Sequence, residues 1–200
     1  MAKSQKVKQV ALYFGSFNPV HIGHMAIANY IAEYTEMDEV WMVISPQNPL
    51  KTKQSMLANN HRLALVKIAI GDYSKLKASD IEFALPIPSF TINTLIKLGL
   101  KYPNNKFTLV LGSDNLETFH KWKSHEEILD NYGVLVYPRP GFIGHALLNL
   151  PNVTLIDAPL MEISATFIRE SIINKKDIRH FLPFGVWEYI KEMHFYESKG

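Results

Sequence analysis

Two histidines stand three positions apart near the amino terminus, in the run HIGH at residues 21–24. Each imidazole ring can donate a hydrogen bond to an oxyanion. A three-residue offset places both rings on one side of the first turn of a helix, and Gly23 between them lets a ligand approach the backbone closely. The spacing therefore predicts that His21 and His24 face the same oxyanion.

The elements around these histidines also suit an anion. We expect a buried strand over residues 8–14, a turn over 15–19 in which glycine eases the backbone geometry, and a helix over 22–34. A strand that leads into a helix in this way aims backbone N–H groups at one point, where the helix dipole adds about half a positive charge. This region is therefore predicted to bind a phosphate.

The composition limits the class of protein. The chain has 200 residues, of which 47% are hydrophobic and 20% charged, enough for one α/β domain with a substantial core. We expect residues 1–200 to form a single domain in which residues 164–200 are a helical carboxyl-terminal part. The net charge of +2 with neutral histidine is too small to indicate a nucleic-acid surface.

Cysteine is absent from the chain, which excludes disulfides, thiolate catalysis and cysteine-based zinc sites. The basic amino terminus is not followed by an apolar signal segment, and no run of about 18 apolar residues occurs. We therefore expect a soluble cytoplasmic protein without a membrane partner. The sequence leaves a homo-oligomer open.

Short apolar runs alternate with helical patterns along the chain. Further strands are expected at residues 40–45, 107–112, 133–137 and 153–156, and further helices at 61–70, 91–100 and the carboxyl terminus. This rhythm predicts a Rossmann-like α/β fold, a parallel sheet with helices on both faces. Such sheets bind ligands outside the carboxyl ends of their strands. The chain has neither GxGxxG nor GxxxxGK[ST], which argues against an ordinary dinucleotide dehydrogenase and a P-loop kinase.

Three further strand ends carry polar residues. Residues 45–51 form a proline-stiffened loop that ends in a lysine, a cation that could meet a phosphate. Gly112 permits close approach of a ligand, and Asp114 can accept hydrogen bonds from ribose hydroxyls. In residues 163–169, hydroxyls at a helix start precede Arg169 by about one turn and supply donors for phosphates. We expect these donors to form the second half of one phosphate site, whose first half contains the two histidines.

In order along the chain, these segments resemble those of the bacterial nicotinate-nucleotide adenylyltransferases, a family of the HxGH nucleotidyltransferase superfamily. The similar runs, spread over residues 8–197, are GSFNPVHIGH, SPQNPLK, SFTINTL, GSDNLETFHKW, RPG, ISATFIR and YIKEMHFYE. Two positions depart from the family's pattern, because Phe14 stands where glycine is common and Asn18 where aspartate is frequent. Asn18 cannot act as a carboxylate in metal or proton chemistry.

The resemblance implies a reaction. A phosphate oxygen of nicotinate mononucleotide would attack the α-phosphorus of ATP in line, without a covalent intermediate, to form deamido-NAD and pyrophosphate in NAD biosynthesis. Catalysis would then come from positioning and from donors aimed at the transition-state oxygens. We expect Mg²⁺ as cofactor, held mainly by the ATP phosphates because it needs few protein ligands, and no metal ligands from the protein.

The resemblance also implies roles for individual residues. The residues expected to be catalytic are His21, His24 and Arg169. Those expected to bind ATP are Gly15, Ser16, Phe17, His21, His24, Gly112, Asp114, Ser164, Thr166 and Arg169. Those expected to bind nicotinate mononucleotide are Asn18, Lys51, Thr91, Trp122 and Arg139. Trp122 would stack on the pyridine ring, and the resemblance favours the acid over the amide as ring substituent, a choice that the residues alone leave open.

Three alternatives share part of these features. A phosphopantetheine adenylyltransferase also has the HxGH turn, but the runs SFTINTL and GSDNLETFHKW resemble nicotinate enzymes instead. A class I aminoacyl-tRNA synthetase has HIGH, but it would be expected to carry a KMSKS-like loop and a tRNA-binding domain. A regulatory module could bind a nucleotide without turnover, and loss of a histidine or of Arg169 would favour it; all three residues are present.

Overall fold

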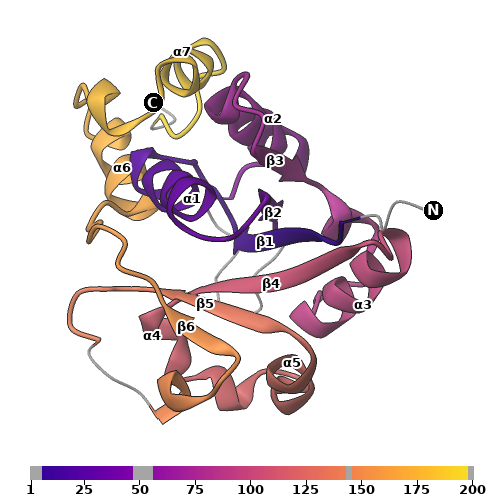
Figure 1. The fold of residues 1–200 in the computed structure, drawn as a ribbon. Helices are drawn as coiled ribbons and strands as arrows, with labels where there is room; N and C mark the ends of the chain where they lie inside the picture. Colours follow the sequence, from indigo (N-terminus) through magenta and orange to yellow (C-terminus); the bar gives the residue numbers. More distant parts are fainter. Residues whose placement is uncertain (1–5, 47–55, 143–145, 198–200) are drawn as a thin grey trace.

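The computed structural model describes residues 6–46, 56–142 and 146–197 (Figure 1). Its sheet has six strands in the order β3-β2-β1-β4-β5-β6, and every neighbouring pair is parallel. The strands are β1 (Lys8–Gly15), β2 (Glu39–Ile44), β3 (Leu76–Ser79), β4 (Asn105–Gly112), β5 (Gly133–Tyr137) and β6 (Val153–Leu155). The Rossmann-like α/β fold expected from the sequence is confirmed.

The strand order creates a switch in the middle of the sheet. From β1 the chain adds β2 and then β3 on one side, and it returns to add β4, β5 and β6 on the other side of β1. The connections therefore leave β1 and β4 in opposite directions. In open α/β sheets ligands bind at the carboxyl ends of the strands at such a point.

Helices cover both faces of this sheet (Figure 1). One face packs against α1 (Ile22–Tyr34), α2 (Asn59–Ile70), α6 (Ala165–Ile173) and α7 (Phe184–Glu192). The other face packs against α3 (Thr91–Lys101) and α5 (His125–Asn131), while α4 (Ser113–Leu116) is a single turn after β4. The short 3-10 helices are η2 (Ile81–Ala84), η3 (Phe119–Lys121), η4 (Ala146–Asn149) and η5 (Arg179–Phe181).

The two apolar cores follow from strand alternation. Within β1, Ala11 and Tyr13 belong to the core under α1, whereas Val10 and Leu12 belong to the core under α3, and all four side chains are buried. Both faces of a central parallel strand are covered, so the strand reads as a continuous apolar run. In the part of the chain that the structure describes, no helix is long and apolar enough to cross a membrane.

Candidate active site

The turn after β1 is shaped by a glycine and a buried phenylalanine. Phe17 is 1% exposed and has a positive φ of 43°. A Cβ atom at Gly15 would lie 2.7 Å from the Phe17 ring, so the close packing of this ring requires glycine. The ring also lies edge-on to His24, with centroids 5.1 Å apart. Gly15 and Phe17 therefore set the shape of the turn, while the neighbouring Ser16 lines a cavity.

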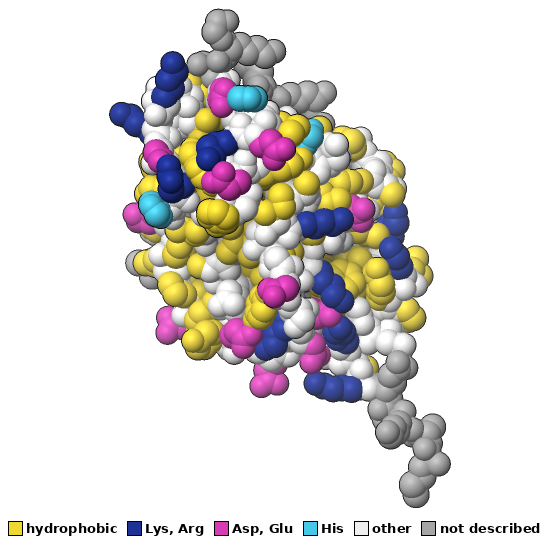
Figure 2. Space-filling model, turned by 90° about the horizontal axis from the view of Figure 1, so that it is seen from above, with side chains coloured by type: hydrophobic (Ala, Val, Ile, Leu, Met, Phe, Trp, Pro, Cys, Tyr) yellow, Lys and Arg dark blue, Asp and Glu magenta, His cyan; other side chains and the backbone are white. Residues whose placement is uncertain are grey.

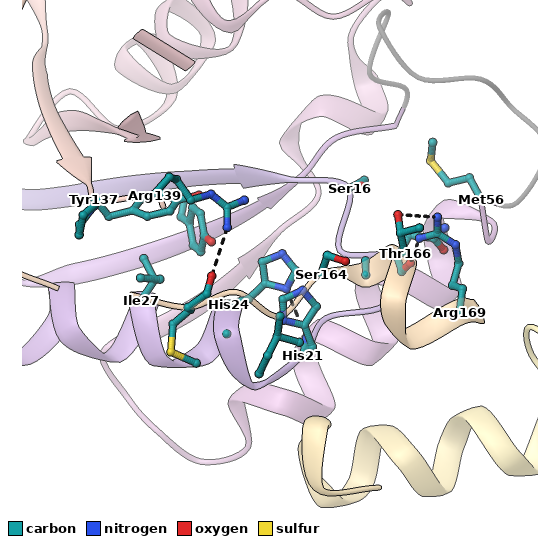
Figure 3. A pocket seen from close by; sticks show the side chains of 17 residues that line it. Ser16, His21, His24, Ile27, Met56, Tyr137, Arg139, Ser164, Thr166 and Arg169 are labelled. Carbon is teal, nitrogen blue, oxygen red and sulfur yellow. Dashed lines mark hydrogen bonds between the residues drawn. The ribbon is translucent and has the colours of Figure 1, made fainter. Parts of the chain in front are cut away.

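The two histidine rings lie side by side at the start of α1, as their spacing predicts. Their centroids are 3.7 Å apart, and the backbone N–H of His21 donates to Nδ1 of His24 at 3.3 Å (Figure 3). Because Nδ1 of His24 accepts this bond, the neutral His24 ring carries its proton on Nε2. His24 can therefore present an N–H donor to an oxyanion.

His21 is held neutral by its surroundings. Its side chain is buried, and its Nδ1 atom has no hydrogen-bond partner among the described residues. Burial, helped by the positive charge of Arg139, lowers the pKa of His21 from 6.5 to about 4. At neutral pH this ring is thus a neutral donor and acceptor.

A cavity of about 520 Å³ opens above these rings, at the carboxyl ends of the strands. In Figure 3 the histidines lie between Arg139 on one side and Thr166 and Arg169 on the other. Cavity-lining residues that the sequence analysis did not single out include Tyr13, Ile27, Met56, Tyr137, Met161 and Ile163. Burial raises the pKa of both Tyr13 and Tyr137, so these phenols stay protonated at neutral pH.

The start of α6 supplies the donors on the second side of the cavity. Ser164 is the N-cap residue, and its hydroxyl oxygen accepts from the Phe167 N–H at 3.1 Å. The Arg169 guanidinium donates to Thr166 Oγ1 at 3.3 Å and to the backbone oxygen of Asn18 at 2.9 Å. Arg169 is thereby fixed against the turn that follows β1.

Asn18 is a junction between three parts of the chain. Its side chain is 5% exposed, and Oδ1 accepts from the Leu57 N–H at 3.1 Å and from the Tyr196 hydroxyl at 2.8 Å. Both bonds need an acceptor oxygen, which an amide provides as a carboxylate would. The replacement of the aspartate that is frequent in the family thus keeps the acceptor at this position.

Arg62, at the start of α2, was not identified by the sequence analysis as a site residue. Its side chain is 0% exposed, and within the described residues its hydrogen bonds all go to neutral oxygens. The acceptors are the backbone oxygens of Ser16, Ser45, Pro46 and Leu57 and the side-chain oxygen of Asn59, at 2.6 to 3.3 Å. A single arginine in a helical pattern carries no sequence signal for such a role.

Arg139 and Asp114 meet where β4 and β5 end. The backbone N–H of Arg139 donates to Ser113 Oγ at 2.9 Å, and its guanidinium Nε lies 3.7 Å from Asp114 Oδ1. A Cβ atom at Gly112 would lie 2.3 Å from that Asp114 oxygen, so any other residue at this position would require the carboxylate to shift. Arg139 lines the cavity together with both histidines.

Thr91 and Trp122, which are also expected to bind the mononucleotide, are not among the residues that line the cavity. Thr91 begins α3, and Trp122 packs half-buried against Phe119 with ring centroids 5.2 Å apart. The residues next to them in the sequence are in contact, and Lys123 Nζ lies 4.8 Å from the centroid of the Phe90 ring. Lys51 lies outside the described residues.

No group of three or more histidine, aspartate or glutamate side chains in the described ranges could hold a metal ion. The polar side chains that line the cavity are imidazoles, guanidinium groups, hydroxyls and one amide. Such a set suits the phosphates of a nucleotide. It fits a divalent ion that is bound by those phosphates, because Mg²⁺ usually keeps several waters and substrate oxygens as ligands.

Known proteins resemble this chain in sequence over most of its length. The cytidylyltransferase-like family matches residues 12–171. A Flavobacterium psychrophilum protein named "Probable nicotinate-nucleotide adenylyltransferase" is 51% identical over 192 residues, which cover 95% of this chain and 100% of that protein. One of the same name from Flavobacterium johnsoniae is 49% identical over 194 residues, with 95% and 100% covered.

A solved structure shares the fold. It is the Plasmodium falciparum nicotinic acid mononucleotide adenylyltransferase complexed with NaAD, with a TM-score of 0.79 and 23% sequence identity. The match covers 94% of this chain and 97% of that one. At this identity the likeness supports the arrangement of strands and helices.

Proposed function

The chain belongs to the nicotinate-nucleotide adenylyltransferases, within the cytidylyltransferase-like family, and on this premise we propose how its residues transfer AMP to nicotinate mononucleotide. The enzyme is a nucleotidyltransferase that forms deamido-NAD and pyrophosphate from ATP and nicotinate mononucleotide in NAD biosynthesis. The observation that carries the assignment of roles is the convergence of His21, His24 and Arg169 on one cavity at the switch point of the sheet.

We assign the ATP phosphates to the donors around this cavity. His21 and His24 would donate N–H groups to the α-phosphate, while Ser164, Thr166 and Arg169 would hold the β- and γ-phosphates. The positive end of the α1 dipole adds to this set of donors. Further ATP contacts are assigned to the backbone at Gly15, Ser16 and Phe17 and, at the ribose, to Gly112 and Asp114.

We assign the mononucleotide to the part of the carboxyl edge of the sheet that lies nearer α3. Trp122 would stack on the pyridine ring, and the Thr91 hydroxyl and the N–H groups at the start of α3 would receive its carboxylate. Arg139 and Asn18 line the cavity and would meet the mononucleotide there, together with Lys51. The contact between Lys123 and Phe90 supports this assignment, because it brings the segments of Thr91 and Trp122 together.

The reaction needs no nucleophile from the protein. A phosphate oxygen of the mononucleotide attacks the α-phosphorus of ATP, the bond to the bridging oxygen breaks, and pyrophosphate leaves with that electron pair. Both reactants are anions, so neutral and cationic donors held in fixed positions lower the barrier. Nucleotidyltransferases of this family use divalent metal ions, and we assign Mg²⁺, bound by the ATP phosphates, to the neutralisation of phosphate charge.

The test is release of pyrophosphate from ATP and Mg²⁺ by the purified protein, measured in parallel with three acceptors. We expect nicotinate mononucleotide to support far faster release than nicotinamide mononucleotide, with no release from phosphopantetheine. Equal rates with the acid and the amide would contradict the acid specificity. Release with phosphopantetheine alone would contradict the assigned acceptor, and no release with any acceptor would contradict catalysis.

A further inference from the structure

A tyrosine near the carboxyl terminus reaches the turn that follows β1. Tyr196, four residues beyond the end of α7, donates its hydroxyl to Asn18 Oδ1 at 2.8 Å, across a separation of 178 residues. Asn18 is 5% exposed and lines the cavity. The last described part of the chain thus touches a residue of the nucleotide site.

Asn18 passes this contact on to Arg169. The backbone oxygen of Asn18 accepts from Arg169 Nη1 at 2.9 Å, and this bond joins the guanidinium group to the turn after β1. The orientation of the Asn18 carbonyl depends on how its residue is held, and Oδ1 of the same residue is fixed by Tyr196 and by the Leu57 N–H. A continuous path of hydrogen bonds therefore leads from Tyr196 through Asn18 to Arg169.

Tyr196 is held in place by packing that does not involve the cavity. The Phe195 N–H donates to the Ile190 oxygen at 3.0 Å, which folds the chain back onto α7. The Phe195 ring packs on His61, with centroids 4.8 Å apart, and on Tyr189 at 5.9 Å. These contacts anchor the segment before it meets Asn18, so Tyr196 can impose a position rather than follow one.

The Tyr196 hydroxyl is suited to act as a permanent donor. Burial raises its pKa well above the ordinary value of 10.0, even though Arg169 and Arg62 act in the opposite direction. The phenol therefore keeps its proton throughout the pH range in which the enzyme can work. Asn18 Oδ1 has no proton to give, so the direction of the bond is fixed.

We propose that Tyr196 is a positioning residue for adenylyl transfer, which orients Asn18 and, through it, the phosphate-binding Arg169. This inference rests on the proposed function of Arg169. In this arrangement the segment after α7 completes the nucleotide site without touching the substrate. ATP binding and turnover then depend on one hydroxyl group that lies outside the cavity lining.

The test compares Tyr196→Phe with Tyr189→Phe. Each variant keeps the ring and loses one hydroxyl, but the Tyr189 hydroxyl bonds to His61 Nδ1 at 3.1 Å, away from Asn18. We expect Tyr196→Phe to lower kcat/KM for ATP about 3- to 10-fold, the range for one buried hydrogen bond. Tyr189→Phe should leave kcat/KM for ATP unchanged.

A double-variant cycle separates this role from a structural one. If Tyr196 acts through Arg169, adding Tyr196→Phe to Arg169→Ala should change neither kcat/KM for ATP nor the affinity for ATP measured by calorimetry. Full kcat/KM for Tyr196→Phe, an equal loss in Tyr189→Phe, or losses that add in the double variant would each overturn the inference.

The same experiments distinguish failure of the inference from failure of the proposed function. An unchanged protein that releases no pyrophosphate with nicotinate mononucleotide would contradict the function. Calorimetry with ATP would still compare the two tyrosine variants, and equal ATP affinities would overturn the positioning role on their own.

Discussion

His21 and His24 differ in how their rings are held, and this difference decides what each can do. The backbone N–H of His21 fixes the tautomer of His24, so that the Nε2 atom of His24 is a donor. His21 instead is buried with an unpartnered Nδ1 among the described residues, and its pKa is lowered to about 4. Both rings are therefore suited to stabilise developing negative charge as hydrogen-bond donors, and His21 is neutral at neutral pH.

The donor role of His24 predicts the effect of its removal. His24→Ala should lower kcat about 10²- to 10⁴-fold and change the KM for ATP much less, because the lost N–H acts mainly in the transition state. Steady-state kinetics with both substrates measure this split. His24→Gln should retain more activity than His24→Asn, since its amide nitrogen reaches closer to the position of Nε2. A large rise in KM at constant kcat would instead make His24 a ground-state binder.

The lowered pKa of His21 predicts a pH dependence of stability. Between about pH 4 and 6.5 the unfolded chain binds a proton at His21 that the folded protein does not bind, so acid favours unfolding. Above pH 6.5 this group does not lower the free energy of unfolding, which decreases as the pH falls from 6.5 toward 4. Urea unfolding at pH 7.5 and 5.0 should show the unchanged protein losing about 2 kcal/mol more than His21→Asn. An equal decrease in the free energy of unfolding of both proteins would contradict the lowered pKa of His21.

The HxGH and ISATFIR segments could be predicted as one site because each carries donor side chains at a helix start, a local pattern. Arg62 and Tyr196 could not, because their partners lie in other segments of the chain. The residues next to Arg62 in the sequence do not indicate that its guanidinium group donates to the carbonyl of Ser16, 46 positions away. Site residues that act through tertiary contacts become visible only once the fold brings them together.

At the scale of elements, the strand and helix boundaries were predicted to within two residues wherever the pattern was strong. The first helix spans Ile22–Tyr34, as expected, since its apolar positions recur with helical spacing. The short edge strand β3 was missed, because its residues LKAS include a single buried side chain, Leu76. An edge strand exposed on one side gives too little alternation to be identified.

Arg62 connects elements that the backbone leaves separate. It joins the end of β1 at Ser16 and the end of β2 at Ser45 to the start of α2. Removing the guanidinium group takes the donor from several partly buried carbonyl groups, and each such loss costs up to about 1–3 kcal/mol.

Arg62→Met should therefore lower the free energy of unfolding by at least about 3 kcal/mol and the Tm by roughly 6–12 °C. Lys67→Met is the matched control, because it removes an exposed cation from the same helix and should change stability by less than about 0.5 kcal/mol. Thermal unfolding followed by circular dichroism compares the two. Similar small shifts in both variants would show that the carbonyl groups find other donors.

At the scale of the whole molecule, the switch between β1 and β4 brings two sets of residues to one edge of the sheet. The histidines and Arg169 come from the side covered by α1 and α6, while Thr91 and Trp122 come from the side covered by α3 and α5. A dinucleotide product has two halves, and under the proposed roles each half would have its own region of this edge. The face in Figure 2 carries interspersed basic and acidic side chains, in keeping with the small net charge.

This division predicts that the two substrates can be weakened independently. Trp122→Ala should weaken binding of nicotinate mononucleotide by about 1–3 kcal/mol, the range for aromatic stacking on a base, and leave ATP affinity nearly unchanged. Calorimetry with each substrate measures the two affinities, and thermal unfolding provides the control. Trp122 also packs on Phe119, so some loss of Tm is expected. Trp122→Phe should restore most of the affinity, because a phenyl ring can still stack. Equal weakening of both substrates, or a lower Tm with no loss of affinity, would show that Trp122 has a purely structural role. The pyridine ring would then bind elsewhere along the sheet edge.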